Sequence, residues 1–523
     1  MNEAASSVSA GPTPTRNNDL FVLVATIGAS AMAFIDGSVV QIALPAIQAD
    51  FKTSFATLQW IVNIYTLFLG ALVLVGGAYG DLLGRRLIFF WGTVLFVGAS
   101  LACGLAPSAA ILVAARAVQG IGAAMMVPQS LAIIAASFPK ETRGAAIGTW
   151  AAASALTTAL GPVIGGFLID TLSWRAAFLI NLPIGLVVLA ITALKVPESR
   201  SQSAGGVDLP GGVLATLGLG ALTVGLVYLP DRGILDPLVL GGFVIAVVAL
   251  PAFVIREART AAPMMPLDLF HDGVFTRVNI LTVLLYGALS GALFLIPYTL
   301  ISVQGYTAAE AGAALLPLGL IIGFFSRLAG SVGDRIGTRL PMIVGPSIVA
   351  LSFAALAVTN AGGSYWVGVF GPIVGLSIGM AITVSPLTTT VMNSVGDQQT
   401  GVASGINNAA ARVAGLLAVA ISGALSIAIF SALLRTSVPA LGLAPDASAA
   451  LLAGTNRLVE APILPSVPPD QAAAVHTLLA DAYLAALRWV ILLNAVLAAA
   501  AALVAWTIPS SRTKAAGPQA SAK

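Results

Sequence analysis

The segment Gly77-Ala-Tyr-Gly-Asp-Leu-Leu-Gly-Arg-Arg86 returns in a similar form as Gly330-Ser-Val-Gly-Asp-Arg-Ile-Gly-Thr-Arg339, and this repeat decides the fold. Each copy separates two long apolar runs, and roughly 250 residues lie between the copies. Such self-similarity is typical of a duplicated membrane protein whose two halves lie in parallel. The spacing also leaves room for an extra pair of helices between the halves.

The composition indicates that most of the chain lies in lipid. Of its 523 residues, 58% are hydrophobic and only 9% are charged, whereas soluble domains carry about 25% charged residues. The 24 basic residues barely exceed the 21 acidic ones, and they form no cluster of the kind that binds nucleic acid. These numbers argue against a soluble protein and against a nucleic-acid partner.

Apolar runs long enough to cross a bilayer occur about fourteen times. A hydrocarbon core of about 30 Å requires roughly 20 apolar residues per helix. We expect spans at residues 20–46, 58–79, 87–106, 109–135, 145–168, 176–195, 209–229, 237–255, 276–300, 310–329, 340–359, 365–391, 402–433 and 484–507. The sequence therefore predicts an all-α integral membrane protein with two pseudo-symmetric six-helix bundles and an inserted helix pair.

This prediction divides the chain into successive parts. These are a cytoplasmic N-terminal tail (residues 1–19), an N-terminal six-helix half (20–195), a cytoplasmic linker (196–208), the inserted helix pair (209–255), a C-terminal six-helix half (256–507) and a cytoplasmic tail (508–523). Within the C-terminal half, residues 436–482 are predicted to form a loosely ordered external loop with some helix.

The basic residues of the connecting loops indicate the orientation of the chain, because short cytoplasmic loops collect Lys and Arg. With the N-terminus inside, the cytoplasmic side has Arg85, Arg86, Lys140, Arg143, Lys195, Arg200, Arg256, Arg259, Arg277, Arg335, Arg339, Arg512 and Lys514. The external side has only Lys52, Arg175, Arg232, Arg435, Arg457 and Arg488. We therefore expect a multi-pass protein of the plasma or inner membrane with both termini in the cytoplasm.

Asp36 is the acidic residue that lies deepest in a predicted span. A charged residue at the bilayer centre costs at least about 2.5–3.5 kcal/mol, so it requires a partner or a function. Arg116 in the fourth span is a candidate partner, and we expect the two residues to act in proton coupling. Two alternatives remain: a neighbour holds Asp36 for packing alone, or Arg116 clamps onto backbone carbonyls. Arg412, a second deep cation, would be functional or would snorkel toward the cytoplasm.

Other residues are candidates for gating and for a substrate cavity. Gly161, Pro162 and Gly165 would let the fifth span bend and pack closely. The repeated loops would close a cytoplasmic gate, or would anchor the topology by charge alone, through Gly77, Asp81, Gly84, Arg85, Arg86, Asp334, Arg335, Gly337 and Arg339. Candidate cavity residues on the first two spans are Phe34, Gln59, Trp60, Asn63 and Tyr65, and Glu310 is a further candidate for substrate contact.

These motifs together resemble the major facilitator superfamily, specifically its fourteen-helix drug:proton antiporter branch. The resemblance rests on the segments at residues 36–45, 77–86, 116–122, 161–166, 174–175 and 178–183. It departs from the usual motifs at Gly37, Ser38, Gln41 and Thr157. The resemblance implies a rocker in which two six-helix halves open alternately to either side of a central cavity. In the fourth-helix motif of the family, the arginine, here Arg116, takes part in proton transfer.

The expected function is therefore proton-coupled export of small, lipophilic or cationic compounds, of the multidrug efflux type. The alternative is an exporter or proton symporter for one metabolite or lipid on the same fold. We expect no enzymatic activity, no metal and no cofactor, because the two histidines lie in predicted loops and no phosphate-binding or nucleophile motif occurs. The expected partners are the substrate, protons and the lipid bilayer, and the resemblance implies a monomer.

Overall fold

The computed structural model describes residues 16–201, 206–359, 364–396 and 399–509. The predicted tails therefore fall mostly outside the described residues, as do Arg512 and Lys514. The side chains of Lys140 and Asp334 are also not described. Within the described ranges, fourteen helical segments are long and apolar enough to cross a membrane. This number confirms the predicted all-α membrane fold.

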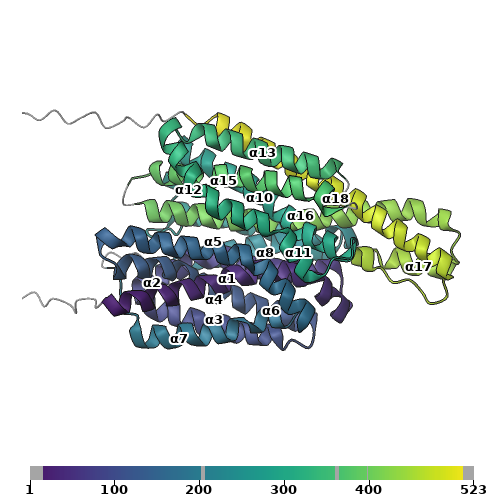
Figure 1. Cartoon of the computed structure of the whole chain (residues 1–523), viewed down its shortest axis with the longest axis horizontal. Coiled ribbons are helices and arrows are strands. Elements are labelled where there is room, and N and C mark those ends of the chain that lie inside the picture. The colour runs from purple at the N-terminus through teal and green to yellow at the C-terminus, as the bar shows by residue number, and fades with distance from the viewer. Residues whose placement is uncertain (1–15, 202–205, 360–363, 397–398, 510–523) are drawn as a thin grey trace, which may run out of the picture.

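The N-terminal half is a bundle of long helices (Figure 1). Its elements are α1 (Arg16–Phe51), α2 (Phe55–Leu83), α3 (Arg85–Gly104), α4 (Ala109–Ser137), α5 (Lys140–Thr171), α6 (Ala176–Leu179) and α7 (Asn181–Lys195). Small residues permit close packing: α3 and α4 approach one another where Gly92 faces Gly122. The side chains of Ser54 and Ser108 each accept a hydrogen bond from a backbone N–H in the first turn of α2 and α4. These two serines therefore cap the helices and fix where they begin.

The C-terminal half forms the second bundle, drawn in green to yellow in Figure 1. Its main elements are α10 (Gly273–Ser302), α11 (Ala308–Ala314), α12 (Leu316–Ile336), α13 (Arg339–Val358), α14 (Tyr365–Gly368), α15 (Phe370–Asn393), α16 (Thr400–Ser437) and α18 (Pro469–Trp506). The described start of α1 and the described end of α18 lie at the same end of the molecule. An even number of crossings requires this arrangement.

The inserted pair consists of α8 (Leu209–Arg232) and α9 (Pro237–Arg259), and α8 packs against α2 and α16. Asp208 caps α8 by accepting a hydrogen bond from the Gly211 N–H, and its Oδ1 also accepts one from Arg256 Nε at 2.7 Å. Burial raises the pKa of the Asp208 carboxyl, but the hydrogen bonds from Arg256 and Gly211 outweigh burial and leave the pKa below its ordinary value. A charge-assisted hydrogen bond thereby joins the start of α8 to the last turn of α9.

The structure corrects the expectation of a loosely ordered external loop at residues 436–482. α16 extends to Ser437, and η3 (Val438–Leu441), α17 (Pro445–Ala453) and η4 (Thr455–Glu460) follow before α18 begins at Pro469. Leu451 and Leu458 are buried, because the alanine- and leucine-rich segment packs its apolar face inward. The last span is thus longer than the predicted 484–507, and a helical cap extends beyond the bundles at the right of Figure 1.

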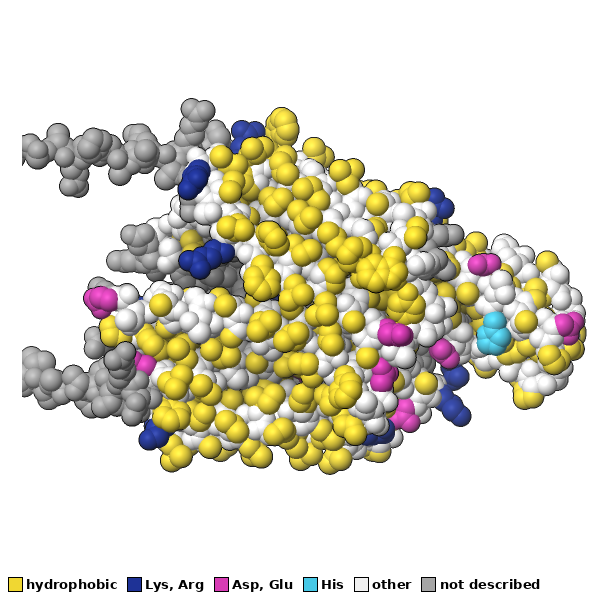
Figure 2. Space-filling view, viewed as in Figure 1, with side chains coloured by type: hydrophobic (Ala, Val, Ile, Leu, Met, Phe, Trp, Pro, Cys, Tyr) yellow, Lys and Arg dark blue, Asp and Glu magenta, His cyan; other side chains and the backbone are white. Residues whose placement is uncertain are grey.

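Apolar side chains cover the long sides of the molecule, and charged side chains concentrate toward its two ends (Figure 2). Exposed residues on these sides include Leu186, Val247, Phe324 and Leu351. In water such an exposed apolar surface would drive aggregation. It matches a lipid-facing belt between two polar ends.

Candidate functional site

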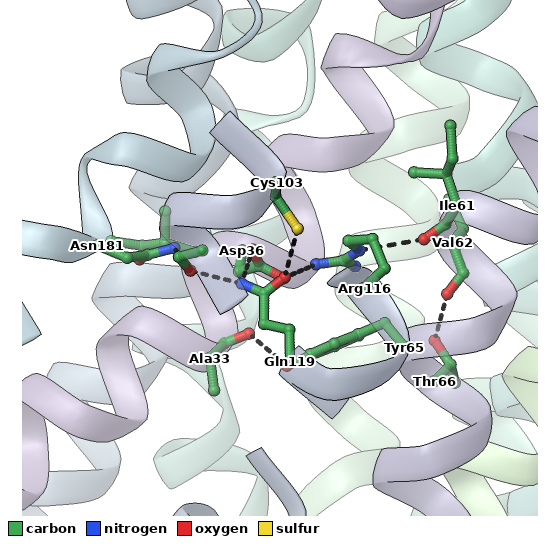
Figure 3. A network of polar contacts seen from close by, with 12 residues as sticks. Ala33, Asp36, Ile61, Val62, Tyr65, Thr66, Cys103, Arg116, Gln119 and Asn181 are labelled. Carbon is green, nitrogen blue, oxygen red and sulfur yellow. Dashed lines mark hydrogen bonds and ion pairs between the residues drawn. The ribbon is translucent and has the colours of Figure 1, made fainter. Parts of the chain in front are cut away.

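The centre of the N-terminal half contains a buried ion pair between α1 and α4. Arg116 Nη1 donates a hydrogen bond to Asp36 Oδ2, and the two side chains are 1% and 0% exposed (Figure 3). The structure therefore brings together the two residues that the sequence suggested as partners. Because an isolated buried charge is costly, each of these residues makes the other tolerable at this depth.

Gln119 completes the network around the carboxylate. It lies one turn after Arg116 on α4, where its Nε2 donates to Asp36 Oδ1 at 2.7 Å and its Oε1 accepts from Arg116 Nη1 at 2.8 Å. Nε2 also contacts Ser100 Oγ on α3 at 2.8 Å, and Asn181 Nδ2 of α7 donates to the same hydroxyl at 3.1 Å. Both carboxylate oxygens of Asp36 thus have donors, and four helices fix the geometry.

α2 holds the other side of the Arg116 guanidinium. Arg116 Nε donates to the Ile61 carbonyl at 3.1 Å, and the guanidinium lies over the Tyr65 ring at 4.2 Å from its centroid. The Tyr65 hydroxyl donates to the Ala33 carbonyl on α1 at 3.4 Å. Arg116 therefore has both a carboxylate and a backbone carbonyl as partners, so the ion pair and the backbone clamp that the sequence left as alternatives coexist.

This arrangement can act as a proton-dependent connection between helices. While Asp36 is ionised, its charge compensates that of Arg116 and joins α1 to α4. A proton on Asp36 would remove the negative charge and leave Arg116 with only neutral partners. The network then has two states that differ by one proton, which is the minimum that proton coupling requires.

The glycines of α5 form its contact with α1 and with α11. Gly161 faces Ser38, and a side chain at Gly165 would collide with Val39 of α1. On the side of α5 that contacts α11, the Pro162 carbonyl lies against Gly312 of α11. The segment that sequence analysis associated with gating therefore lies where the N-terminal half meets the C-terminal half, close to the turn of α1 that carries Asp36.

The first repeated loop is stabilised within its own half. Gly84 has φ +126°, a conformation that favours glycine, and Arg85 Nη2 donates to Asp81 Oδ1 at 2.8 Å. Glu198, rather than the loop aspartate, accepts hydrogen bonds from the N–H groups of Arg86 and Leu87 at the start of α3. Asp81 is already occupied by Arg85 one turn away. Gly77, on the last turns of α2, faces Pro128 of α4.

The second repeated loop is also tied to its own half. Gly337 has φ +89°, and Arg339 Nη2 donates to the Trp506 carbonyl at the end of α18 at 2.6 Å. The side chain of Arg335 is exposed, and that of Asp334 lies outside the described residues. The repeat in sequence thus corresponds to two similar turns, each preceding a helix in its own bundle.

The two halves are joined at the end opposite the repeated loops. Asp170 at the end of α5 accepts hydrogen bonds from the N–H groups of Ala308 and Ala309, at 3.0 and 2.8 Å. Tyr298 of α10 donates to Gln48 Oε1 of α1 at 2.9 Å. These contacts close the end of the molecule that the loop charges predict to be external, and with that orientation the structure is outward-closed.

The predicted cavity residues occupy different environments. Gln59 is fully buried and donates from Nε2 to the Val419 carbonyl of α16 at 3.0 Å. Trp60 packs against a small apolar cluster of Ala56, Val227 and Ala420, from α2, α8 and α16. Asn63 is fully buried, and neither atom of its amide has a hydrogen-bond partner in the described residues. Tyr65 belongs to the ion-pair network described above.

Three further candidates are placed as follows. Phe34 is half-buried on α1, and its carbonyl accepts a hydrogen bond from Ser38 Oγ. Glu310 lies exposed in the first turn of α11, where it forms a capping box with Thr307 and so is engaged in helix capping. Arg412 lies opposite Gly70, where a methyl group on that glycine would be 3.2 Å from Arg412 Cβ.

Sequence reasoning missed three residues that hold the site together. Gln119 stands one helical turn from Arg116, and this spacing alone would have suggested that it shares the arginine's partner. Asp170 and Glu198 lie near helix ends, and each bonds to a helix N-terminus distant in sequence. A cap between segments that are distant in sequence leaves no local pattern, so only the packed structure reveals it.

The structure has two helical bundles, a buried ion pair in the first bundle, and contacts that join the two bundles at one end. These features define a membrane transporter with two halves. The chain belongs to the Major Facilitator Superfamily, whose family model matches residues 26–419. It is similar to the Multidrug resistance protein Stp of Mycobacterium tuberculosis, with 35% identity over 80% of this chain and 77% of that protein. It is also 34% identical to the Cephamycin export protein CmcT of Amycolatopsis lactamdurans, over 80% and 88% of the two chains.

A similar fold occurs among solved structures. A bacterial homologue of the human lysosomal transporter Spinster, in an inward-facing and unoccupied conformation, superposes with a TM-score of 0.67. The superposition covers 94% of this chain and 98% of that one, at 19% sequence identity. The likeness supports the arrangement of the two bundles.

Proposed function

We propose that this protein is a proton-driven exporter of small lipophilic molecules, of the multidrug efflux type. It acts as a monomer with both termini in the cytoplasm, and it uses a proton gradient rather than a cofactor. Support comes from relatives named for multidrug resistance and for cephamycin export. The observation that carries the proposal is the fully buried network of Asp36, Arg116 and Gln119.

In this account, Asp36 is the proton carrier. When the external side opens, Asp36 takes up a proton and loses its attraction for Arg116. Removing one partner of a buried ion pair costs about 3–5 kcal/mol, which is enough to change the favoured packing of α1 against α4. When the cytoplasmic side opens, Asp36 releases the proton and the pair re-forms, as in the outward-closed structure.

The proton gradient supplies enough free energy for export. One pH unit contributes about 1.36 kcal/mol per proton, and a membrane potential of 100 mV contributes about 2.3 kcal/mol per charge. A single deep carboxylate carries one proton per cycle. Exchange of one proton for a neutral substrate would therefore use both the pH gradient and the potential.

The proposal is tested by measuring dye accumulation in cells that produce the protein. Cells are loaded with a lipophilic fluorescent dye, and accumulation is compared with that of cells carrying an empty vector, with and without a protonophore. Lower accumulation that the protonophore abolishes is the expected result. Equal accumulation in both strains would contradict efflux, and higher accumulation in the producing strain would indicate the symport alternative.

A further inference from the structure

Arg412 of α16 is a half-buried cation without an acidic partner in the part of the chain that the structure describes. Its Nε donates to Asn408 Oδ1 one turn away on the same helix at 3.1 Å. The residue lies 12 positions after Thr400, or about 18 Å along α16. A guanidinium that far along a membrane-spanning helix is stabilised by a counter-charge or a polar ligand, since it cannot be deprotonated.

The nearby carboxylate does not supply that counter-charge. Asp36 is occupied by Arg116 and Gln119. Arg412 lies within electrostatic reach of Tyr65, whose ring covers Arg116. Arg412 therefore adds an uncompensated positive charge to this region.

A second polar group without a partner faces the same seam between the halves. Gln59, Asn63 and Gly70 lie on one stripe of α2 by helical spacing. Gln59 bonds to the backbone of α16, and Gly70 meets Arg412, so the stripe faces α16. Asn63 lies between them, fully buried, with both amide atoms unpaired within the described residues. An unpaired buried amide is unfavourable, so a ligand that pairs with it is stabilised.

An apolar cavity of about 520 Å³ adjoins this polar region. It lies between α2, α8, α10 and α16, with Leu74, Leu219, Ile280 and Val413 among its lining residues. Gly70 lines the cavity and also contacts Arg412, so the cavity and the arginine lie next to the same turn of α2. The volume is in the range of small-molecule sites, which span about 300–1,000 Å³. The cavity is bordered by both halves and by the inserted pair, so its shape depends on how the halves are arranged.

We propose that Arg412 is the recognition residue for the acidic group of the transported molecule, and that the substrate is an amphiphilic anion whose apolar part occupies the cavity beside α8. Asn63, farther along the same stripe of α2, offers a hydrogen bond to another polar group of the molecule. This inference rests on the proposed export function and specifies its substrate class. It favours anionic over cationic compounds, because the Asp36 carboxylate is already paired with Arg116 and Arg412 is positively charged.

The test compares three fluorescent probes with the same pyrene-alkyl tail and different head groups: a sulfonate, a trimethylammonium and an uncharged hydroxyl. Binding to the purified full-length protein in nanodiscs is measured by energy transfer from tryptophan to pyrene. Charge-assisted hydrogen bonds contribute about 1.5–3 kcal/mol, so the sulfonate should bind the wild type about tenfold or more tightly than the cation.

The variants are Arg412→Gln, Arg412→Lys and Arg435→Gln, the last of which removes an exposed charge from the same helix. Arg412→Gln should lose the preference for sulfonate while keeping its affinity for the hydroxyl probe, which shows that the site is folded. Arg412→Lys should retain part of the preference, and Arg435→Gln all of it. Absence of sulfonate binding to the wild type, tighter binding of the cation, or an unchanged preference in Arg412→Gln would each overturn the proposal.

The outcome is independent of the test of export itself. If dye efflux fails but the sulfonate binds through Arg412, the proposed function is wrong and the anion site stands. If efflux is proton-dependent but Arg412→Gln transports the sulfonate and hydroxyl probes as the wild type does, the export function stands and the substrate class is wrong.

Discussion

The Asp170 carboxylate at the end of α5 accepts a hydrogen bond from the Ala308 N–H at the start of α11, and so joins the N-terminal half to the C-terminal half. The second carboxylate oxygen accepts from the next N–H along α11 at 2.8 Å. A carboxylate at a helix N-terminus is favoured by the helix dipole. The end of the molecule opposite the repeated loops is therefore closed by an interaction that opening would have to break.

Asp170→Ala should shift the protein toward its outward-open state. Both hydrogen bonds are partly accessible to solvent, so their loss should change the equilibrium by about 1–2 kcal/mol, or five- to thirtyfold. Distances between spin labels at Leu172→Cys and Ala313→Cys, in a Cys103→Ser background, report the separation of the two halves at this end. A longer distance in Asp170→Ala is expected, and an unchanged distribution would show that Asp170 is not part of the closure.

A large side chain at Gly165 should impair transport by separating α5 from α1. The position faces Val39, and inserted volume in a packed contact costs about 1–3 kcal/mol. Gly148→Leu on the same helix is the control, because a side chain there meets no atom within 4 Å. Dye efflux and thermal unfolding in detergent should fall for Gly165→Leu and stay near wild type for Gly148→Leu. Equal effects of the two substitutions would contradict a specific helix contact.

Removal of the cap on α3 should destabilise the protein. The Glu198 carboxylate accepts two backbone hydrogen bonds in the first turn of that helix, and loss of a capping residue costs about 1 kcal/mol. Glu198→Ala should therefore unfold at a lower temperature in a thermal-shift assay, with Glu198→Gln intermediate. Glu460→Ala, which removes an exposed glutamate at the end of η4, serves as the control. A melting temperature of Glu198→Ala equal to that of this control would contradict the capping role.

The Tyr65 ring should matter more than its hydroxyl group. A guanidinium over an aromatic ring is stabilised by about 0.5–2 kcal/mol, whereas the hydrogen bond from Tyr65 to the Ala33 carbonyl is long at 3.4 Å. Tyr65→Phe should keep most of the transport rate, and Tyr65→Leu should lose about fivefold or more. Tyr228→Leu removes a ring that covers Arg232 outside the site and should have little effect. Equal losses in both Tyr65 variants would assign the role to the hydroxyl.

The membrane fold was predictable because its signals are local. Long apolar runs, small residues and the repeated Gly-Asp-Arg loops determine the number and order of the helices. The folded cap at residues 436–482 was missed, since its alanine-rich segment has too few long apolar stretches to suggest packing. Its burial arises from contacts with distant residues, such as the hydrogen bond from Gln48 Nε2 to the Arg457 carbonyl at 3.2 Å.

The site was predictable only in part. Asp36 and Arg116 could be paired from the sequence because charges in a membrane span are rare and costly. The contacts of Glu198 and Asp170 join segments more than 100 residues apart, and no sequence periodicity encodes them. The placement of Trp60 against α8 likewise depends on how the inserted pair packs on the first bundle.

The most direct test of the central claim is to measure proton movement during transport by the Asp36→Asn variant. The protein is reconstituted in vesicles with an imposed pH gradient, and proton flux is recorded when substrate is added. Asp50→Asn, which alters another acid on α1 that pairs with Arg175 at the external end, is the matched control. We expect substrate-triggered flux in the wild type and in Asp50→Asn, and none in Asp36→Asn. Flux of wild-type size in Asp36→Asn would contradict the assignment of Asp36 as the proton carrier.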